Sequence, residues 1–306
     1  MADKRRAKRA SNQRSEGARL FREWEGLHAD SPPVLYHYTS AQGLLAMVKS
    51  GHVWATESRY LNDPREFLHG AELILRVMDQ LGGRKPTSPG LDWLRSTVTR
   101  HIEEKAQNAR IFCASFCQDG DLLSQWRGYG DTGGGYALGF CPELLLGQGK
   151  MERPPVRVLR RVIYDPAEQT RLVESWTQAM AGGAVSPQEP LFWRFFSEAV
   201  ISFKDPAYDE EGEWRLIQFG RVFSSTRQWM HPVEFRERRG RIVPYADLDL
   251  SRSTGPYAGK LPVREIVHGP TQDPERSGKA LRLLVEARGY AEDQIRLRRS
   301  AVPFTA

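Results

Sequence analysis

Cysteine is scarce in this chain of 306 residues, which has three: Cys113, Cys117 and Cys141. So small and odd a number cannot build a disulfide framework, and a reducing compartment is the natural environment. No apolar run approaches the roughly 20 residues that span a bilayer. The first 14 residues lack the apolar segment of a secretory signal. We therefore expect a cytoplasmic protein with no membrane partner.

Several sequence motifs that indicate a known catalytic or binding chemistry are absent. The sequence has no GxxxxGK[ST], no HExxH and no paired CxxC. Its seven histidines do not follow metal-ligand spacing, so we expect no metal. The glycine-rich stretch 128–140 does not follow the strand, GxGxxG and helix order of a dinucleotide fold. Its glycines indicate a turn that enters a strand.

The net charge of +6 is unevenly distributed. Residues 1–14 hold six basic side chains and one acidic one, which leaves only +1 for the remainder. We expect residues 1–14 to form a disordered basic tail that either keeps the protein soluble or contacts an acidic partner. Residues 15–306 show no repeat and no linker, so we expect one domain.

Hydrophobic periodicity indicates an α+β fold with a mixed, largely antiparallel sheet and flanking helices. Strands are expected at residues 34–40, 52–56, 110–117, 134–140, 156–164, 213–219, 232–237, 241–245, 262–269 and 294–300. Helices are expected at residues 16–28, 40–49, 64–83, 91–108, 121–130, 166–181, 188–203 and 275–288.

The tripeptide His37-Tyr38-Thr39 ends a short strand that enters a helix at Ser40. Polar residues at such a strand end are typical of ligand sites, and the following helix N-terminus favours an anion. A lone strand histidine is more often a core residue with its hydrogen bonds satisfied, and that alternative stays open.

Asn62, Asp63 and Glu66 cluster at the start of a helix. Helix capping and the helix dipole explain them well, so they are secondary candidates. Trp126 and Arg127 are also candidates, because an arginine beside an aromatic ring can clamp a phosphate. The alternative is an ordinary surface helix end.

Glu211 and Glu213 stand two residues apart at the expected start of a strand. Period two places both carboxylates on one face, where they repel unless a cation intervenes. Arg215 continues that face and is the candidate cation. The alternative is a solvated edge with a weak ion pair.

Five segments together resemble a bacterial family, domain-of-unknown-function family 2971. They run from Tyr36 to Ser40, Gly43 to Phe67, Ser115 to Phe140, Lys204 to Leu216 and Arg264 to Pro270. The opening segment is in turn similar to the first motif of ADP-ribosyltransferase folds, in which a strand carries His-x-Thr. A later strand in those folds opens with Glu-x-Glu, which Glu211-Gly212-Glu213 matches.

The ADP-ribosyltransferase resemblance implies NAD as substrate and a role for each matched residue. His37 would hold the ribose, backbone groups of Tyr38 would orient the carboxamide, and Thr39 would complete the motif. Glu213 would hydrogen-bond the ribose 2′-hydroxyl and stabilise the cationic transition state, while Glu211 would orient or deprotonate the acceptor.

Two further contacts to NAD have candidates. Tyr60 is the first candidate for the ring that stacks on nicotinamide, and Trp54 and Tyr136 are the others. Arg127 is the candidate for the pyrophosphate.

The resulting hypothesis is an NAD-dependent ADP-ribosyltransferase, acting as a toxin or anti-phage effector on nucleic acid or protein. RNA 2′-phosphotransfer is a neighbouring alternative, but it requires a basic surface that a body of +1 hardly offers. The alternative of a different class is a non-catalytic nucleotide- or nucleic-acid-binding module of a defence or stress system. Glu213 discriminates between enzyme and module, because only the enzyme needs its carboxylate.

Overall fold

A computed structural model describes residues 16–61, 65–84, 92, 94–100, 111–130, 134–147, 157–182, 190–220, 233–238, 240–253, 255–271 and 273–303. The contacts within the chain gather into two compact units, each described here by itself. Unit 1 comprises residues 1–30, 58–110 and 160–209, and unit 2 comprises residues 31–57, 111–159 and 210–306. No composition shift marks these boundaries in the sequence. The expectation of a single domain over residues 15–306 stays a prediction about independent folding.

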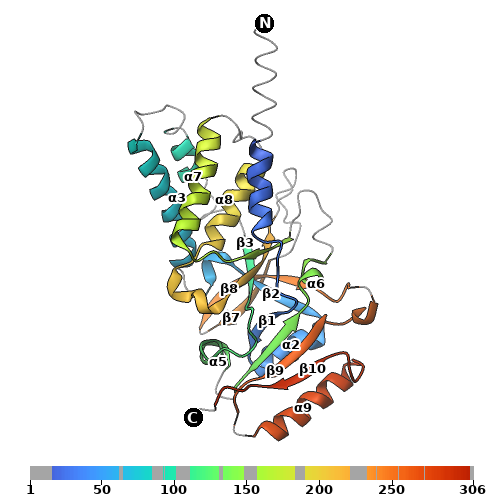
Figure 1. The fold of residues 1–306 in the computed structure, drawn as a ribbon. Coiled ribbons are helices and arrows are strands. Elements are labelled where there is room, and N and C mark those ends of the chain that lie inside the picture. The colour runs from blue at the N-terminus through green and yellow to red at the C-terminus, as the bar shows by residue number, and fades with distance from the viewer. Residues whose placement is uncertain are drawn as a thin grey trace. The chain divides into compact units, whose positions relative to one another are not determined.

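Unit 1 is mainly helical where it is described, apart from residues 160–161, which end a strand, and the bridge between Ile163 and Phe203. Residues 16–26 form its first helix. Residues 94–100 are also helical. The labelled helices are α3 (Arg65–Arg84), α7 (Pro166–Ala181) and α8 (Pro190–Ser202), and α3 packs against both α7 and α8 (Figure 1). Helix α7 begins where the sequence dictates, because the Asp165 side chain accepts a hydrogen bond from the Ala167 amide and Pro166 occupies the first turn.

Aromatic rings and one buried carboxylate hold unit 1 together. The rings of Trp176 and Phe195 stack with centroids 4.2 Å apart, and both are buried. Glu198 is fully buried and accepts hydrogen bonds from Arg160 and Arg194 at 2.6 and 2.7 Å. A buried carboxylate is tolerated here because cations and donors surround it.

Unit 2 contains two sheets, whereas the sequence analysis expected one. Sheet A has the order β1-β4-β9-β10 and sheet B has the order β5-β6-β3-β2-β8-β7. Neighbours are antiparallel wherever their direction is described, except for the parallel pair β9–β10. The strands are β1 (Leu35–Thr39), β2 (His52–Glu57), β3 (Ile111–Phe116), β4 (Tyr136–Phe140), β5 (Arg157–Arg161), β6 (Trp214–Phe219), β7 (Val233–Arg238), β8 (Arg241–Asp249), β9 (Val263–His268) and β10 (Arg296–Arg299).

The described part of unit 2 has four α-helices: α2 (Ala41–Ser50), α5 (Leu123–Tyr129), α6 (Pro142–Leu146) and α9 (Pro274–Ala287). Helix α2 has the expected boundaries. The Ser40 hydroxyl accepts from the Gly43 amide, and Gly51 ends the helix at φ 74°, a left-handed conformation that favours glycine.

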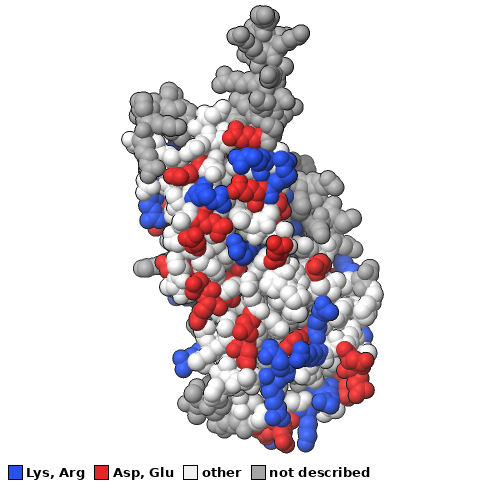
Figure 2. Space-filling model, in the orientation of Figure 1, with Lys and Arg blue, Asp and Glu red and all other residues white. Residues whose placement is uncertain are grey.

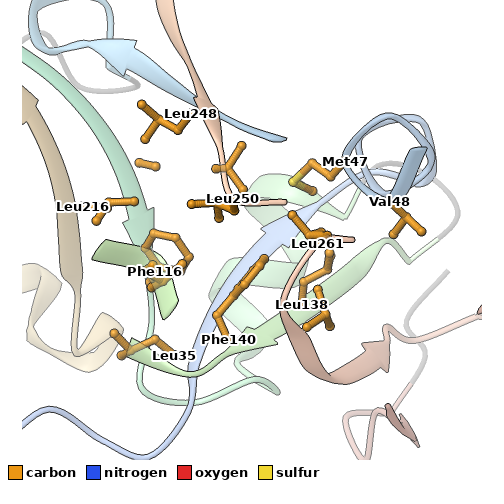
Figure 3. Close-up of a cluster of buried hydrophobic side chains, with 14 of the residues drawn as sticks. Leu35, Met47, Val48, Phe116, Leu138, Phe140, Leu216, Leu248, Leu250 and Leu261 are labelled. Atoms are coloured by element: carbon orange, nitrogen blue, oxygen red, sulfur yellow. The ribbon is translucent and has the colours of Figure 1, made fainter. Parts of the chain in front are cut away.

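The main core of unit 2 contains side chains from both sheets. Phe116 of β3 lies with Leu35 of β1 and Phe140 of β4, and α2 contributes Met47 and Val48 (Figure 3). A second, smaller cluster contains Tyr38, Cys117, Trp126, Ala137 and Val267. Sheet A therefore packs on both faces: Leu35 and Phe140 face the main core, and Tyr38 and Ala137 face the smaller cluster.

The α+β class and the largely antiparallel pairing are confirmed. The described strands and helices fall within the expected ranges or differ from them by a few residues, except that α6 was not expected. The tail over residues 1–14 lies outside the described residues. On the visible face of the molecule acidic and basic side chains are intermixed (Figure 2), in keeping with a body of nearly zero net charge. Among the described helices none is long and apolar enough to cross a membrane.

Candidate functional site

The two sheets meet at a fork centred on Ser115 of β3. Strand β1 joins β3 through a single bridge, in which Tyr36 and Cys117 exchange both backbone hydrogen bonds at 2.8 Å. Strand β2 pairs with β3 only at Thr56 and Glu57. Ser115 lies between these contacts, so β1 and β2 separate from β3 on either side of it. We call this opening the fork.

His37 occupies the fork. Its Nδ1 lies 2.9 Å from the carbonyl oxygen of Ser115. Since a carbonyl only accepts, Nδ1 carries the proton and Nε2 is left as an acceptor. Burial lowers the pKa of His37, the Ser115 hydrogen bond opposes this, and the charge of Arg236 lowers the pKa further. The imidazole is therefore neutral at pH 7.

The backbone of Tyr38 faces the same opening. Tyr36 directs its N–H and C=O towards β3. Tyr38 lies two residues further along the strand, so its N–H and C=O point to the same side, away from β4. Within the described part of the chain no residue bonds these two groups. An adjacent donor and acceptor of this kind suit a primary carboxamide. The Tyr38 side chain lies on the other face of β1, where its hydroxyl donates to the Asp119 carbonyl and accepts from the Leu122 amide.

Glu213 and Arg215 form a buried ion pair beside the fork. Arg215 Nε and Nη2 lie 2.8 and 2.9 Å from the two carboxylate oxygens, and the residues are 3% and 1% exposed. Arg215 is the register partner of Ser115. The spacing between adjacent strands therefore places the Cα atoms of His37 and Glu213 about 10 Å apart, within the span of one nucleotide. The cation that the sequence pattern suggested for Glu213 is indeed Arg215.

Glu211 does not share a strand face with Glu213. It ends the 3₁₀ helix η3 (Pro206–Glu211), and strand β6 begins only at Trp214. Gly212 between the two glutamates has φ 48°, which breaks the extended conformation. The period-two argument from the sequence is wrong for this pair, because it assumed an extended Gly212.

A second cluster on the same face of sheet B was missed by the sequence analysis. Arg236 of β7 donates from Nη2 to Thr56 Oγ1 at 2.7 Å. Its guanidinium lies 5.5 Å from the Trp54 ring and 5.7 Å from the Tyr245 ring. Trp54 and Thr56 alternate on β2, which signals a shared face. The place of Arg236 depends on the β7–β8 pairing, for which the local sequence holds no signal.

Among the aromatic candidates, Trp54 is the one placed on the face that carries Glu213. It is 40% exposed. Tyr60 belongs to unit 1, in the 3₁₀ helix η1 (Ser58–Tyr60). Tyr136 packs partly against the main core of unit 2, with its hydroxyl 3.5 Å from Ser277 Oγ.

The α5 candidates lie on the other face of sheet A from His37. Trp126 packs edge-on against the Tyr38 ring and donates to Asp121 at 2.8 Å, so it is a core residue. Arg127 is exposed on the same helix, and no described contact brings it to the fork. Thr39 is half-buried, and its hydroxyl lies against Gly43 in the first turn of α2.

Asn62 and Asp63 lie outside the described residues, as does the side chain of Glu66. In the described part of the chain, no three His, Cys, Asp or Glu side chains cluster as metal ligands. No curated protein and no solved structure matches the chain. Residues 125–216, from α5 to β6, match the model of the family described as protein of unknown function (DUF2971), and this match confirms the resemblance to that family.

Proposed function

We propose that unit 2 binds NAD at the fork and transfers its ADP-ribose to an acceptor. One arrangement carries the proposal: the outward-facing peptide groups of Tyr38 adjoin His37, and strand spacings put Glu213 about 10 Å from His37. These are the groups needed to hold a carboxamide and a ribose, and to stabilise positive charge.

The neutral His37 is suited to binding rather than proton transfer. Its Nδ1 proton is engaged by Ser115, which fixes the ring orientation. Its Nε2 is then an acceptor for a ribose hydroxyl. The donor and acceptor of the Tyr38 backbone take the two ends of the nicotinamide carboxamide, so that the glycosidic bond is held in one orientation.

In the proposal, Glu213 supplies the negative charge that stabilises the cation formed on the ribose. An ionised carboxylate has about four acceptor positions, and the bidentate contact with Arg215 uses two of them. In this proposal the carboxylate accepts a hydrogen bond from the ribose 2′-hydroxyl. When the bond from ribose C1′ to nicotinamide breaks, its electron pair leaves with nicotinamide, and the carboxylate stabilises the cation that forms. The acceptor then bonds to C1′ and passes its proton to a base, for which Glu211 is the candidate.

In this proposal the acceptor is a nucleic acid or a protein, as expected of a toxin or anti-phage effector. The three cysteines form no disulfide, which supports a reducing compartment such as the cytoplasm.

A second candidate function is a non-catalytic nucleotide-binding module. The observation that favours it is the occupation of both Glu213 oxygens by Arg215 in a buried pair. A module of this kind binds NAD through His37 and Tyr38 and leaves the glycosidic bond intact.

The variant Glu213→Gln separates these two functions. We expect wild-type protein to release nicotinamide from NAD, and Glu213→Gln to release it at least about 100-fold more slowly, because a neutral amide stabilises the cation poorly. The melting-temperature rise produced by millimolar NAD should persist in the variant. Nicotinamide is measured by chromatography, and Glu210→Gln, an exposed neighbour, serves as the matched control with unchanged release.

Each outcome has a consequence. Binding without nicotinamide release in the wild type overturns the enzyme and leaves the module. Absence of any melting-temperature shift overturns both. Undiminished release in Glu213→Gln overturns the role given to Glu213.

A further inference from the structure

The guanidinium of Arg236 is a half-buried cation that has no carboxylate partner among the described residues. Burial lowers the pKa of Arg236, and nearby Arg238 lowers it further. Its described hydrogen bond goes to the neutral hydroxyl of Thr56. Within the described residues no carboxylate lies within ion-pair distance, and the buried Nε has no hydrogen-bond partner.

Two other arginines of unit 2 have a carboxylate partner that balances their charge. Arg215 lies 2.8 Å from Glu213, and Arg298 lies 2.6 Å from Glu265. A cation withdrawn from water is destabilising unless an opposite charge compensates it. The attraction of the Trp54 and Tyr245 rings for a guanidinium is weaker than the cost of desolvating a charge. The remaining compensation is expected from an anion that binds there.

The position of Arg236 relates this anion to the fork. Thr56, which Arg236 contacts, pairs with Cys113, two residues before Ser115, whose carbonyl is bonded by His37. The charge of Arg236 also lowers the pKa of His37. Trp54 is 40% exposed next to Arg236, which offers a planar ring surface beside the cation. A cation and a flat apolar ring side by side suit a phosphorylated nucleotide.

We infer that Arg236 binds a phosphate group of the nucleotide held at the fork, with Trp54 beside it as a stacking surface. The inference rests on the proposed function, because it names the part of the same ligand that Arg236 contacts. A planar guanidinium bonds two phosphate oxygens at once, whereas an ammonium acts as a point charge. The inference assigns the diphosphate contact to Arg236, whereas the sequence analysis assigned it to Arg127.

Binding of phosphorylated and phosphate-free probes by full-length protein tests the inference. The probes are ADP-ribose, inorganic pyrophosphate and nicotinamide riboside, with dissociation constants from calorimetry. We expect Arg236→Met to weaken ADP-ribose and pyrophosphate about 30- to 100-fold and nicotinamide riboside less than about twofold. Arg236→Lys keeps the charge but loses the planar guanidinium that bonds two oxygens at once. We therefore expect it to weaken ADP-ribose and pyrophosphate binding by an intermediate factor of about 10. Arg241→Met, at an exposed hairpin position, is the control with no change.

A purely structural role for Arg236 predicts a different pattern, in which all three probes weaken equally. That result overturns the inference, as does unchanged binding of ADP-ribose or failure of wild-type protein to bind either phosphorylated probe. If Arg236→Met does not fold, the ratio measured for Arg236→Lys decides. Pyrophosphate binding that depends on Arg236 without nicotinamide release leaves the inference intact and removes the transferase. Nicotinamide release with an unchanged KM in Arg236→Met overturns the inference and leaves the transferase intact.

Discussion

Arg215→Met is expected to lower the free energy of unfolding by about 3–5 kcal/mol, because it removes the cation that contacts both oxygens of the buried Glu213 carboxylate. Glu213 is 3% exposed and its oxygens lie 2.8 and 2.9 Å from Arg215. Methionine fills a similar volume, so the loss reports charge rather than packing. Urea denaturation followed by tryptophan fluorescence measures it.

The double variant Glu213→Gln/Arg215→Met identifies the cause. Removing both charges removes the uncompensated carboxylate, so the double variant should regain most of the lost stability. A double variant as unstable as Arg215→Met would show that the guanidinium stabilises unit 2 through contacts other than Glu213.

Gly70→Ala is expected to lower the free energy of unfolding by about 3 kcal/mol, at the upper end of the range for overpacking. A Cβ at position 70 of α3 would meet the backbone of Val200 in α8: it would lie 2.8 Å from the carbonyl carbon and from Cα, and closer still to the oxygen. Backbone atoms cannot rotate away, so the two helices of unit 1 must separate. Thermal and urea unfolding of the variant measure the loss.

Gly82→Ala is the matched control in the same helix. A Cβ there meets nothing within 4 Å, and alanine is the better helix former by up to about 1 kcal/mol. Its stability should be unchanged or higher. Equal losses in the two variants would mean that the α3–α8 contact does not require a glycine.

The local parts of the fold follow from the sequence. Ser40 and Gly51 delimit α2 as the capping rules predict, because hydrogen bonds within a few residues determine both ends. Trp214 and Leu216 alternate towards the core as a strand pattern predicts. Such features depend on neighbours in the chain and are therefore readable from it.

The fork could not be predicted in this way. It exists because β1 leaves β3 after the Tyr36–Cys117 bridge, a contact between segments about 80 residues apart that no local pattern records. Arg236 of β7 reaches Thr56 of β2 across the one strand between them, β8, through pairings that no local pattern records. The sequence analysis found His37, Glu213 and Arg215 as chemical types. Their arrangement required the long-range pairing of the strands.

The central claim is that His37 and Glu213 serve one ligand, and a double-mutant cycle on ligand affinity tests it most directly. The ligand is a carbocyclic NAD analogue that cannot be cleaved, titrated by calorimetry into wild type, His37→Ala, Glu213→Gln and the double variant. Residues about 10 Å apart with no shared partner have additive effects, so coupling requires that both contact the ligand. We predict a coupling energy of at least about 0.5 kcal/mol. Losses that add to within about 0.3 kcal/mol would contradict the claim.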